Sequence, residues 1–365
     1  MKIAILGTRG IPNRYGGFER FAEEIALEFS RLGHQVYVTR PSNQFDVKEF
    51  APKILSVKIK VPKIPIANLA TLYYDFVSLR WATKNDFDAI IECGYSFSPL
   101  LLFVSGSIRK ILITNPDGIE HQREKWGFLA KKYLLFSERL VFKLSAKIVC
   151  DSRALIYYYS QKYKAKLYYV PYGARPLLNI PERMTIAGID PNSDYYLLVS
   201  RVTPENSIET ILSYFVLSGK TCLVVGGLTS KYAKRIKSKF SGYGNIIFLG
   251  TIYDQTVLNT LRYYCKGYIH GHSAGGTNPS LLEAMACGCF VIAHDNPFNR
   301  EVLGENAGFY FNDYITFKHC IARFEELDMN VINEIKQQNV ACIQNNFLWS
   351  RVALDYIKVI AELEK

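Results

Sequence analysis

Short apolar runs alternate with amphipathic segments along almost the whole chain, and this alternation limits the possible folds more than any other feature. Lys2–Leu6 is an apolar run typical of a buried strand, and apolar residues recur at helical spacing from Phe18 to Leu32. Gly33 is a typical helix stop, and a second strand is predicted at Val36–Thr39. This strand–helix–strand opening predicts a parallel sheet whose strands are joined by crossover helices.

The alternation continues in two series, separated by the Pro/Gly segment PYGARP at 171–176. Further strands are predicted before it at Asp88–Glu92, Lys110–Thr114, Lys147–Cys150 and Leu167–Val170, and after it at 195–200, 221–227, 245–251, 267–272 and 290–295. Helices are predicted at about 206–218, 230–240, 254–264, 279–287 and 348–363. A chain of 365 residues exceeds one hydrophobic core, and about 150 residues per domain gives about two domains. The fold class is therefore α/β, with Rossmann-like domains predicted at 1–175 and 176–347.

The charge balance is basic, with a formal net charge of +11. It favours a polyanionic partner, although a solvated basic surface is the simpler alternative. No zinc-finger spacing or heptad array supports nucleic-acid binding, and the eight cysteines suggest buried thiols rather than a metal site. The chain shows no signal peptide and no apolar run of about 18 residues, so we expect a cytoplasmic protein without a spanning helix.

Ligands of doubly wound domains bind at the carboxyl ends of the strands, where loops enter helices. For this chain that rule selects the loops at 7–17, 92–97, 115–121, 200–206, 226–229 and 271–280.

The first of these loops, in GTRGIPNRYGGFER (7–20), opens a helix with the pair Gly16 and Gly17. Its glycines do not follow the GxGxxG dinucleotide pattern, but open N–H groups at a helix start suit an anion or a sugar hydroxyl. Arg9 and Arg14 add positive charge. The alternative is a tight turn with solvated arginines.

The segment 272–303 contains a second predicted helix start. Pro279 suits the first helical turn, with Asn278 or Thr277 before it as the cap, and the helix dipole there suits a diphosphate. Glu283 follows one turn later, where a carboxylate can accept ribose hydroxyls or merely complement the dipole. Arg201 follows a predicted strand and is suited to phosphate or to a surface ion pair.

Taken together, these segments resemble the GT-B glycosyltransferases of family four over nearly the whole chain. The resemblance is carried by GGFERFAEEIALEFSRLGHQVYVTR, YLLVSR, LLEAMACGCFVIA and FLWSRVALDYI. It implies two Rossmann-like domains facing across a cleft, the first for the acceptor and the second for the nucleotide sugar. It also implies that a helix at 348–365 crosses back to the first domain.

A subgroup is indicated by GTRGIPNRYGGFE, NPDGIEHQREKW, RVTPEN, HGHSAGGTNPSLLEAM and FNREVL. These motifs resemble bacterial rhamnosyltransferases of cell-wall and capsule assembly. The resemblance implies transfer of L-rhamnose from dTDP-L-rhamnose to a lipid-diphosphate-linked saccharide, by a protein peripheral to the inner face of the plasma membrane. The alternatives are a GT-B enzyme with another donor such as a UDP-sugar, a nucleotide-sugar epimerase or phosphorylase of the same architecture, and a non-catalytic nucleotide-binding scaffold.

The site residues follow from the loops and the resemblance together. Asp117, Arg201 and Glu283 are the candidate catalytic residues. The predicted acceptor contacts are Arg14, Tyr15, Glu19, Glu120 and His121. The predicted donor contacts are Gly16, Gly17, Arg201, Asn206, Gly226, Gly275, Gly276, Thr277, Asn278, Pro279, Ser280, Leu281 and Glu283.

Two positions depart from the family pattern. The first glutamate of the EX7E motif, which helps to hold the donor sugar, is replaced by Gly275, whereas Glu283 fills the second, ribose-binding place. The diphosphate-binding pair keeps Arg201, but its lysine is replaced by Asn206, which can donate a hydrogen bond but carries no charge. No DxD motif is present, so the resemblance implies retaining transfer without a metal or other cofactor, in which Arg201 and helix dipoles stabilise the departing nucleotide.

The segment 128–147 combines lysines and arginines with Leu and Phe at helical spacing. A basic amphipathic helix of this kind predicts binding to an anionic membrane surface. The alternative for its apolar half, notably Leu134 and Phe142, is packing against the core of the first domain.

Overall fold

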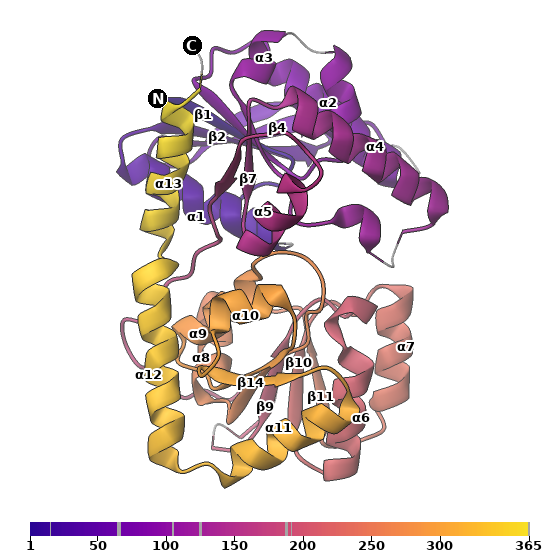
Figure 1. Ribbon diagram of the computed structural model, residues 1–365, viewed down its shortest axis with the longest axis vertical. Helices are drawn as coiled ribbons and strands as arrows, with labels where there is room; N and C mark the ends of the chain where they lie inside the picture. Colours follow the sequence, from indigo (N-terminus) through magenta and orange to yellow (C-terminus); the bar gives the residue numbers. More distant parts are fainter. Residues whose placement is uncertain are drawn as a thin grey trace. The chain divides into compact units, whose positions relative to one another are not determined.

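The computed structural model describes residues 1–14, 16–63, 67–103, 106–123, 126–186, 189–190 and 192–363. The chain divides into two compact units, which are described separately. The first unit comprises Met1–Tyr172 with Trp349–Lys365, and the second comprises Gly173–Leu348. Both are α/β units built on largely parallel sheets (Figure 1).

The first unit has an eight-stranded sheet in the order β3-β4-β2-β1-β5-β6-β7-β8. Its strands are β1 (Lys2–Leu6), β2 (Gln35–Ser42), β3 (Asp46–Ala51), β4 (Ile54–Lys60), β5 (Ala89–Cys93), β6 (Leu112–Asn115), β7 (Lys147–Cys150) and β8 (Leu167–Tyr169). All pairs are parallel except β3–β4. Sequence periodicity missed this edge hairpin because β3 is largely exposed and charged, so it has no apolar face to detect.

Helices join these strands as the alternating pattern predicted. They are α1 (Gly17–Arg31), α2 (Ala67–Ala82), α3 (Gly106–Lys110), α4 (Phe128–Leu144) and α5 (Arg153–Ser160), with short 3-10 turns η1 (Ser98–Phe103) and η2 (Glu120–Gln122). The C-terminal helix α13 (Trp349–Ala361) packs on α1, where the ring of Phe21 lies 5.4 Å from Tyr356 and 6.3 Å from Trp349. The predicted return of the last helix to the first unit is therefore confirmed.

The second unit has an all-parallel sheet in the order β11-β10-β9-β12-β13-β14. Its strands are β9 (Tyr196–Val199), β10 (Cys222–Val225), β11 (Ile246–Gly250), β12 (Gly267–His270), β13 (Val291–His294) and β14 (Gly308–Phe311). Its helical segments are η3 (Pro204–Asn206), α6 (Ile208–Ser218), α7 (Lys231–Phe240), α8 (Gln255–Tyr264), α9 (Pro279–Ala286), α10 (Pro297–Leu303), α11 (Tyr314–Glu326) and α12 (Met329–Asn346).

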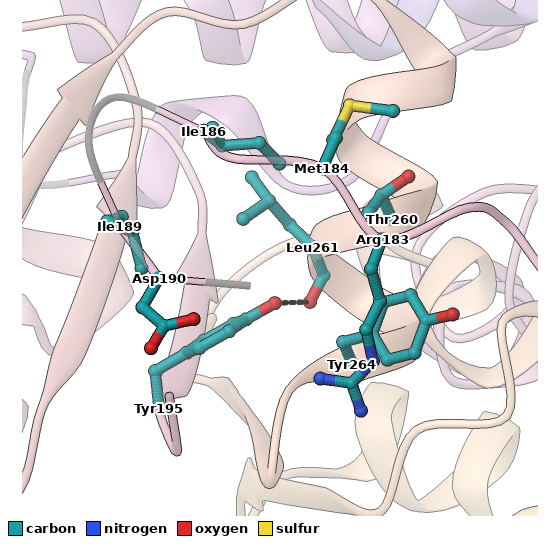
Figure 2. Close-up of a pocket in the computed structure, with 9 residues that line it drawn as sticks. All are labelled: Arg183, Met184, Ile186, Ile189, Asp190, Tyr195, Thr260, Leu261 and Tyr264. Atoms are coloured by element: carbon teal, nitrogen blue, oxygen red, sulfur yellow. Dashed lines mark hydrogen bonds between the residues drawn. The ribbon is translucent and has the colours of Figure 1, made fainter. Parts of the chain in front are cut away.

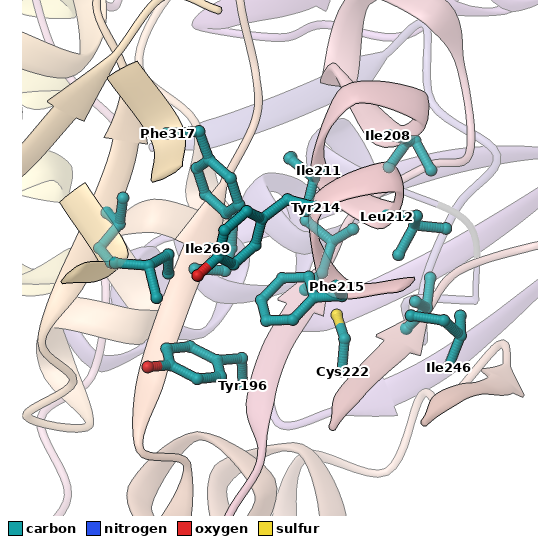
Figure 3. Close-up of a cluster of buried hydrophobic side chains, with 14 of the residues drawn as sticks. Tyr196, Ile208, Ile211, Leu212, Tyr214, Phe215, Cys222, Ile246, Ile269 and Phe317 are labelled. Carbon is teal, nitrogen blue, oxygen red and sulfur yellow. The ribbon is translucent and has the colours of Figure 1, made fainter. Parts of the chain in front are cut away.

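An aromatic core fixes the second sheet against its helices. Tyr196 and Ile269 from the sheet meet Phe215 of α6 and Phe317 of α11 in one buried cluster (Figure 3). The rings of Phe215 and Phe317 are 6.0 Å apart and nearly perpendicular, a favourable edge-to-face arrangement. This packing holds the central strands rigidly, so the loops at their carboxyl ends start from fixed positions.

Both sheets reverse their strand order at a central strand. In the first unit β1 lies between β2 and β5, and in the second unit β9 lies between β10 and β12. At such a switch point the two neighbouring loops run in opposite directions and leave a crevice that commonly binds ligands. The loops concerned are 7–16 and 94–97 in the first unit, and 200–206 and 271–278 in the second.

Two buried carboxyl groups lie at the first switch point. Glu92, the next-to-last residue of β5, pairs with Leu6 of β1 and is 1% exposed, and Asp75 of α2 is 6% exposed. Burial raises the pKa of Asp75 to about 7. Burial, together with the charge of Asp75, also raises the pKa of Glu92 well above its usual range. Each group therefore binds its proton more tightly in the folded chain than in the unfolded chain.

Asp75→Asn should therefore stabilise the protein at alkaline pH. A carboxyl group with a raised folded pKa contributes stability when protonated, and that contribution falls as pH rises from about 4 towards 7. Removing the group should raise the free energy of unfolding by about 1–3 kcal/mol at pH 8, with little gain at pH 4. Thermal melting across this range measures the effect, and an equal change in stability at both pH values would contradict it.

Candidate functional site

The second switch point lies between the loop after β9 and the loop after β12. These loops are bonded directly to each other, because the backbone N–H and the hydroxyl of Ser273 both donate to the carbonyl of Glu205, each at 2.9 Å. Gly271 permits this close approach, since a Cβ there would lie 2.0 Å from the carbonyl oxygen of Asn206. The two loops thus form one unit at the end of the sheet.

Asn206 joins three parts of this loop pair. Its amide nitrogen donates to the carbonyl of Arg201 at 2.6 Å and to the hydroxyl of Thr203 at 3.0 Å. Its amide oxygen lies 2.8 Å from Nδ1 of His272, so that nitrogen is the donor. Asn206 is only 3% exposed and both amide hydrogens are in use. Asn206 therefore holds the two loops together in this structure, and its hydrogen bond to a diphosphate stays a prediction.

Arg201, unlike the buried Asn206, lies at the surface. Its side chain is exposed, and its guanidinium has no ion-pair partner among the residues that the structure describes. Asn206 holds its backbone carbonyl, so the chain is fixed while the charged group is left for an anion. Gly226, predicted as a donor contact, has a packing role: a Cβ there would lie 2.1 Å from the carbonyl oxygen of Ser200.

Helix α9 begins as the sequence predicts, with Asn278 as its cap and Pro279 in its first turn. However, the N–H of Ser280 donates to Oδ1 of Asn278 at 2.9 Å, and the N–H of Leu281 donates to its carbonyl at 3.1 Å. The hydroxyl of Ser280 donates to the carbonyl of Val199, at the end of β9. These groups therefore hold α9 in place, and the contacts of Ser280 and Leu281 with a diphosphate stay a prediction.

The backbone N–H groups that are available to an anion lie in the loop just before α9. Among the described residues, the N–H groups of Gly275, Gly276 and Asn278 have no hydrogen-bond partner. Gly275 has φ of +112°, a conformation that a glutamate would adopt only under strain. This explains the first departure from the EX7E pattern: the loop needs glycine for its backbone shape. Thr277, another predicted contact, is 3% exposed.

Glu283, in the second turn of α9, lies at the edge between core and surface. Its side chain is 15% exposed, and Oε2 lies 2.5 Å from Nη2 of Arg262 on α8. Arg262 is 1% exposed. Sequence reasoning missed this partner, since an arginine in the last turn of a helix ordinarily indicates only complementation of the dipole.

The first switch point has an open helix start. Gly16 caps α1 without a side-chain hydrogen bond, and the N–H groups of Gly17 and Phe18 have no partner among the described residues. By contrast, side chains cap α5, α7, α8, α9 and α10. Arg14 is exposed nearby in sequence, and its guanidinium has no partner within the described part of the chain. Tyr15 lies outside the described residues.

Acidic residues of α1 shape this loop. Oε1 of Glu19 accepts the N–H of Arg9 at 2.8 Å, and Oε2 of Glu23 accepts the N–H of Asn13 at 2.5 Å. Glu19 is only 5% exposed. Glu19 therefore holds the loop before α1 through the N–H of Arg9, and its contact with the acceptor stays a prediction.

The predicted residues after β6 form an ion-pair network in the first unit. Arg123 lies 2.7 Å from Oε2 of Glu120 and 3.5 Å from Oδ2 of Asp117. Nδ1 of His121 lies 2.9 Å from Oε2 of Glu138, which is fully buried and also bonded to Lys162 and Tyr163. Glu120 and His121 are thus engaged inside the unit. Asp117, with φ of +55° and a side chain 38% exposed, is the member most open to solvent.

A separate small hollow lies in the second unit (Figure 2). Its lining includes Arg183, Tyr195, Leu261 and Tyr264. Tyr195 precedes β9, so the hollow lies at the amino end of the sheet, opposite the loops described above. It is not part of the switch-point site.

Comparison with known proteins agrees with this geometry. Residues 179–340 match the family Glycosyl transferases group 1, and residues 1–175 match a domain of unknown function (DUF1972). An uncharacterized glycosyltransferase of Methanocaldococcus jannaschii is 24% identical over 395 residues, covering 100% of this chain and 99% of that protein. Residues 179–340 of the second unit are therefore similar to glycosyltransferase group 1 domains.

Solved structures share the fold over both units. Sucrose-phosphate synthase from Thermosynechococcus elongatus gives a TM-score of 0.84 at 18% identity, covering 99% of this chain and 98% of that chain. Anabaena HepE, in complex with UDP and glucose, gives 0.74 at 15% identity, with 99% of each chain covered. The comparisons support a glycosyltransferase with the GT-B fold. The predicted fold class is confirmed.

Asn206→Leu should weaken nucleotide binding, because it frees the carbonyl of Arg201 and releases His272. The dissociation constant for the bound nucleoside diphosphate should rise by about tenfold, as expected for lost hydrogen bonds between buried groups. Titration calorimetry measures it. The matched control is Asn245→Leu, since Asn245 braces two carbonyls at the amino edge of the same sheet. Equal losses of affinity in both variants would contradict the loop role of Asn206.

Proposed function

We propose that this chain is a rhamnosyltransferase that moves L-rhamnose from dTDP-L-rhamnose to a saccharide carried on a lipid diphosphate. The observation that supports nucleotide-sugar binding most directly is the second switch point. There an exposed guanidinium, partnerless backbone N–H groups and a carboxylate belong to two loops and a helix that are bonded together. That combination suits a diphosphate and a ribose.

Each group has a part in donor binding. Arg201 neutralises the diphosphate, and the N–H groups of Gly275, Gly276 and Asn278 donate to its oxygens. Glu283 accepts a hydrogen bond from a ribose hydroxyl. Asn206 contributes indirectly, because it holds the loops that carry Arg201 and His272.

The proposed reaction breaks the bond between the anomeric carbon and the diphosphate oxygen. Positive charge develops on the sugar, and the leaving dTDP gains negative charge, which Arg201 and the backbone N–H groups stabilise. The acceptor hydroxyl attacks the anomeric carbon from the same face. Its proton passes to the departing diphosphate oxygen, so no protein nucleophile and no metal ion take part.

The first unit is proposed to bind the acceptor. Arg14 and the open start of α1 suit a negatively charged group, and Asp117 suits a sugar hydroxyl. His121 and Glu120 support this region through the Glu138 and Arg123 pairs rather than by direct contact.

The sugar and the base of the donor are the most specific parts of the proposal. The rhamnosyltransferase motifs favour dTDP-L-rhamnose. A UDP-sugar is the second candidate, because trehalose-phosphate synthase from Burkholderia xenovorans is described as UDP-forming and the Anabaena protein holds UDP. A thermal-shift panel of nucleoside diphosphates and their sugars separates the two.

We expect dTDP and dTDP-L-rhamnose to raise the melting temperature more than UDP, GDP, ADP or UDP-glucose. A ligand at about 100 times its dissociation constant stabilises the folded state by about 2.7 kcal/mol, which is readily measured. An equal or larger rise in melting temperature with UDP-glucose would indicate that the donor is a UDP-sugar and would contradict the assignment of dTDP-L-rhamnose.

The control for this panel is Arg201→Ala, which removes the proposed diphosphate charge without touching the buried core. This variant should abolish most of the rise in melting temperature. It should also lower kcat/KM by the factor that corresponds to a loss of about 2–4 kcal/mol in transition-state stabilisation. A full response in this variant would mean that the nucleotide binds elsewhere.

We also propose that α4 binds an anionic membrane surface. Residues of α4 one turn apart form an exposed stripe without acidic side chains: Leu129, Lys132, Phe136, Arg139 and Lys143. Leu129 is 80% exposed and Phe128, beside it, is 71% exposed. The core-packing alternative applies only to the opposite face, where Leu134 and Phe142 are buried. Among the described residues no helix is long and apolar enough to cross a bilayer.

Binding to vesicles that contain anionic lipid should be reversible and should fall steeply with salt. Each basic residue near such a surface contributes about 1 kcal/mol to the free energy of membrane binding. Reversing Lys132, Arg139 and Lys143 to Glu should therefore abolish sedimentation with vesicles while leaving nucleotide binding intact. Reversal of the exposed Lys231, Lys234 and Lys237 of α7 is the matched control. No sedimentation of the native protein at low salt would disprove the membrane role.

A further inference from the structure

We propose that Arg262 is a positioning residue for the donor nucleotide: it holds the carboxylate of Glu283 so that this carboxylate can accept a ribose hydroxyl. The inference rests on the proposed function of Glu283. It adds a residue that lies beneath the surface and has no contact with the donor.

The two side chains come from neighbouring helices. Arg262 is in the last turn of α8, and Glu283 is in the second turn of α9. Nη2 of Arg262 lies 2.5 Å from Oε2 of Glu283. Within the part of the chain that the structure describes, the guanidinium of Arg262 has no other ion-pair partner. Nε and Nη1 have no hydrogen-bond partner there either.

The pair is asymmetric in burial. Arg262 is 1% exposed, whereas the side chain of Glu283 is 15% exposed. The arginine therefore approaches the carboxylate from the core, and the carboxylate faces outwards. An ionised carboxylate offers about four lone-pair positions, so the bond to Nη2 leaves capacity for further donors. A ribose hydroxyl is a donor of this kind.

The backbone beneath the pair is also fixed. The thiols of Cys265 and Cys289 lie 3.0 Å and 3.1 Å from the carbonyl oxygen of Arg262. This oxygen belongs to the last turn of α8, while Cys289 follows α9 directly. The end of α8 is thus tied to the end of α9. Glu283 therefore has both a fixed backbone and a fixed charge partner.

Burial of a guanidinium is costly, and its attraction to one carboxylate rarely gives a net gain in stability. A buried apolar side chain of similar size would stabilise this position at least as well. An arginine here is better explained by what it does to Glu283: its bond to Oε2 restricts the rotamers of the carboxylate. A carboxylate held in one orientation accepts a hydroxyl hydrogen bond in a defined direction.

The test compares two nucleotides that differ in one hydroxyl group: dTDP and its 3′-deoxy analogue, 2′,3′-dideoxythymidine diphosphate. In the native protein, removal of the 3′-hydroxyl should weaken binding by about 10-fold to 100-fold, as for a hydrogen bond to a charged group. Arg262→Met should reduce this ratio to near one, and Arg262→Lys should restore part of it. If the native protein binds UDP instead, UDP and 3′-deoxy-UDP replace the thymidine pair.

Two further variants keep the test decisive. Arg262→Met removes the arginine beside the carboxylate, so the double variant Arg262→Met with Glu283→Gln, which removes both charges, guards against a loss of folding. It should bind the two nucleotides equally. Lys266→Met breaks the ion pair with Glu325 at the amino edge of the same sheet and should leave the ratio unchanged.

The outcomes distinguish the positioning role of Arg262 from the ribose-binding role of Glu283. Loss of the hydroxyl preference in both Glu283→Gln and Arg262→Met supports the positioning role. Loss in Glu283→Gln but a native ratio in Arg262→Met overturns it and leaves the donor site intact. A native ratio in Glu283→Gln shows that Glu283 does not bind ribose, and then the proposed function of that residue fails first.

Discussion

The proposed donor site depends on the position of β9 between β10 and β12. Because the strand order reverses there, the loops after β9 and β12 flank the switch point, and the hydrogen bonds from Ser273 to the carbonyl of Glu205 connect them. Asn206 also links the two loops, because its buried side-chain amide is hydrogen-bonded to Arg201, Thr203 and His272. The exposed guanidinium of Arg201 therefore stands on a rigid backbone, although the side chain itself has no partner in the described chain.

The two units differ in how the N–H groups at their helix starts are satisfied. A parallel sheet directs helix starts towards its carboxyl edge, where unpaired N–H groups need a partner. Most helices there are closed by Ser, Asp or Asn caps, as in α5, α8 and α10. Helix α1 has no such cap, and α9 is capped but is preceded by a glycine turn. Among the described residues, unsatisfied backbone donors lie in both switch-point loops, although α4 and α6 also begin without a side-chain cap.

Several side chains that the sequence indicated as ligands hold the switch-point loops together in the structure. Glu19 bonds to the backbone of Arg9, Ser280 to the end of β9, and Asn206 to the loop around it. Residues that touch a ligand and residues that support them often share polar character and closeness in sequence. Only burial and hydrogen-bond partners distinguish the two roles, and both are properties of the folded chain.

The sequence by itself determined the α/β class, the two series of strands, the start of α9 and the loops that carry the candidate chemistry. These follow from local causes: apolar periodicity, glycine conformations and capping residues act within a few positions along the chain. Only the tertiary structure decided that Arg262 lies beneath Glu283, that Asn206 bonds to His272, and that β3 and β4 form an antiparallel edge. Those contacts join residues that lie apart in sequence or give no apolar pattern, so no local signal specifies them.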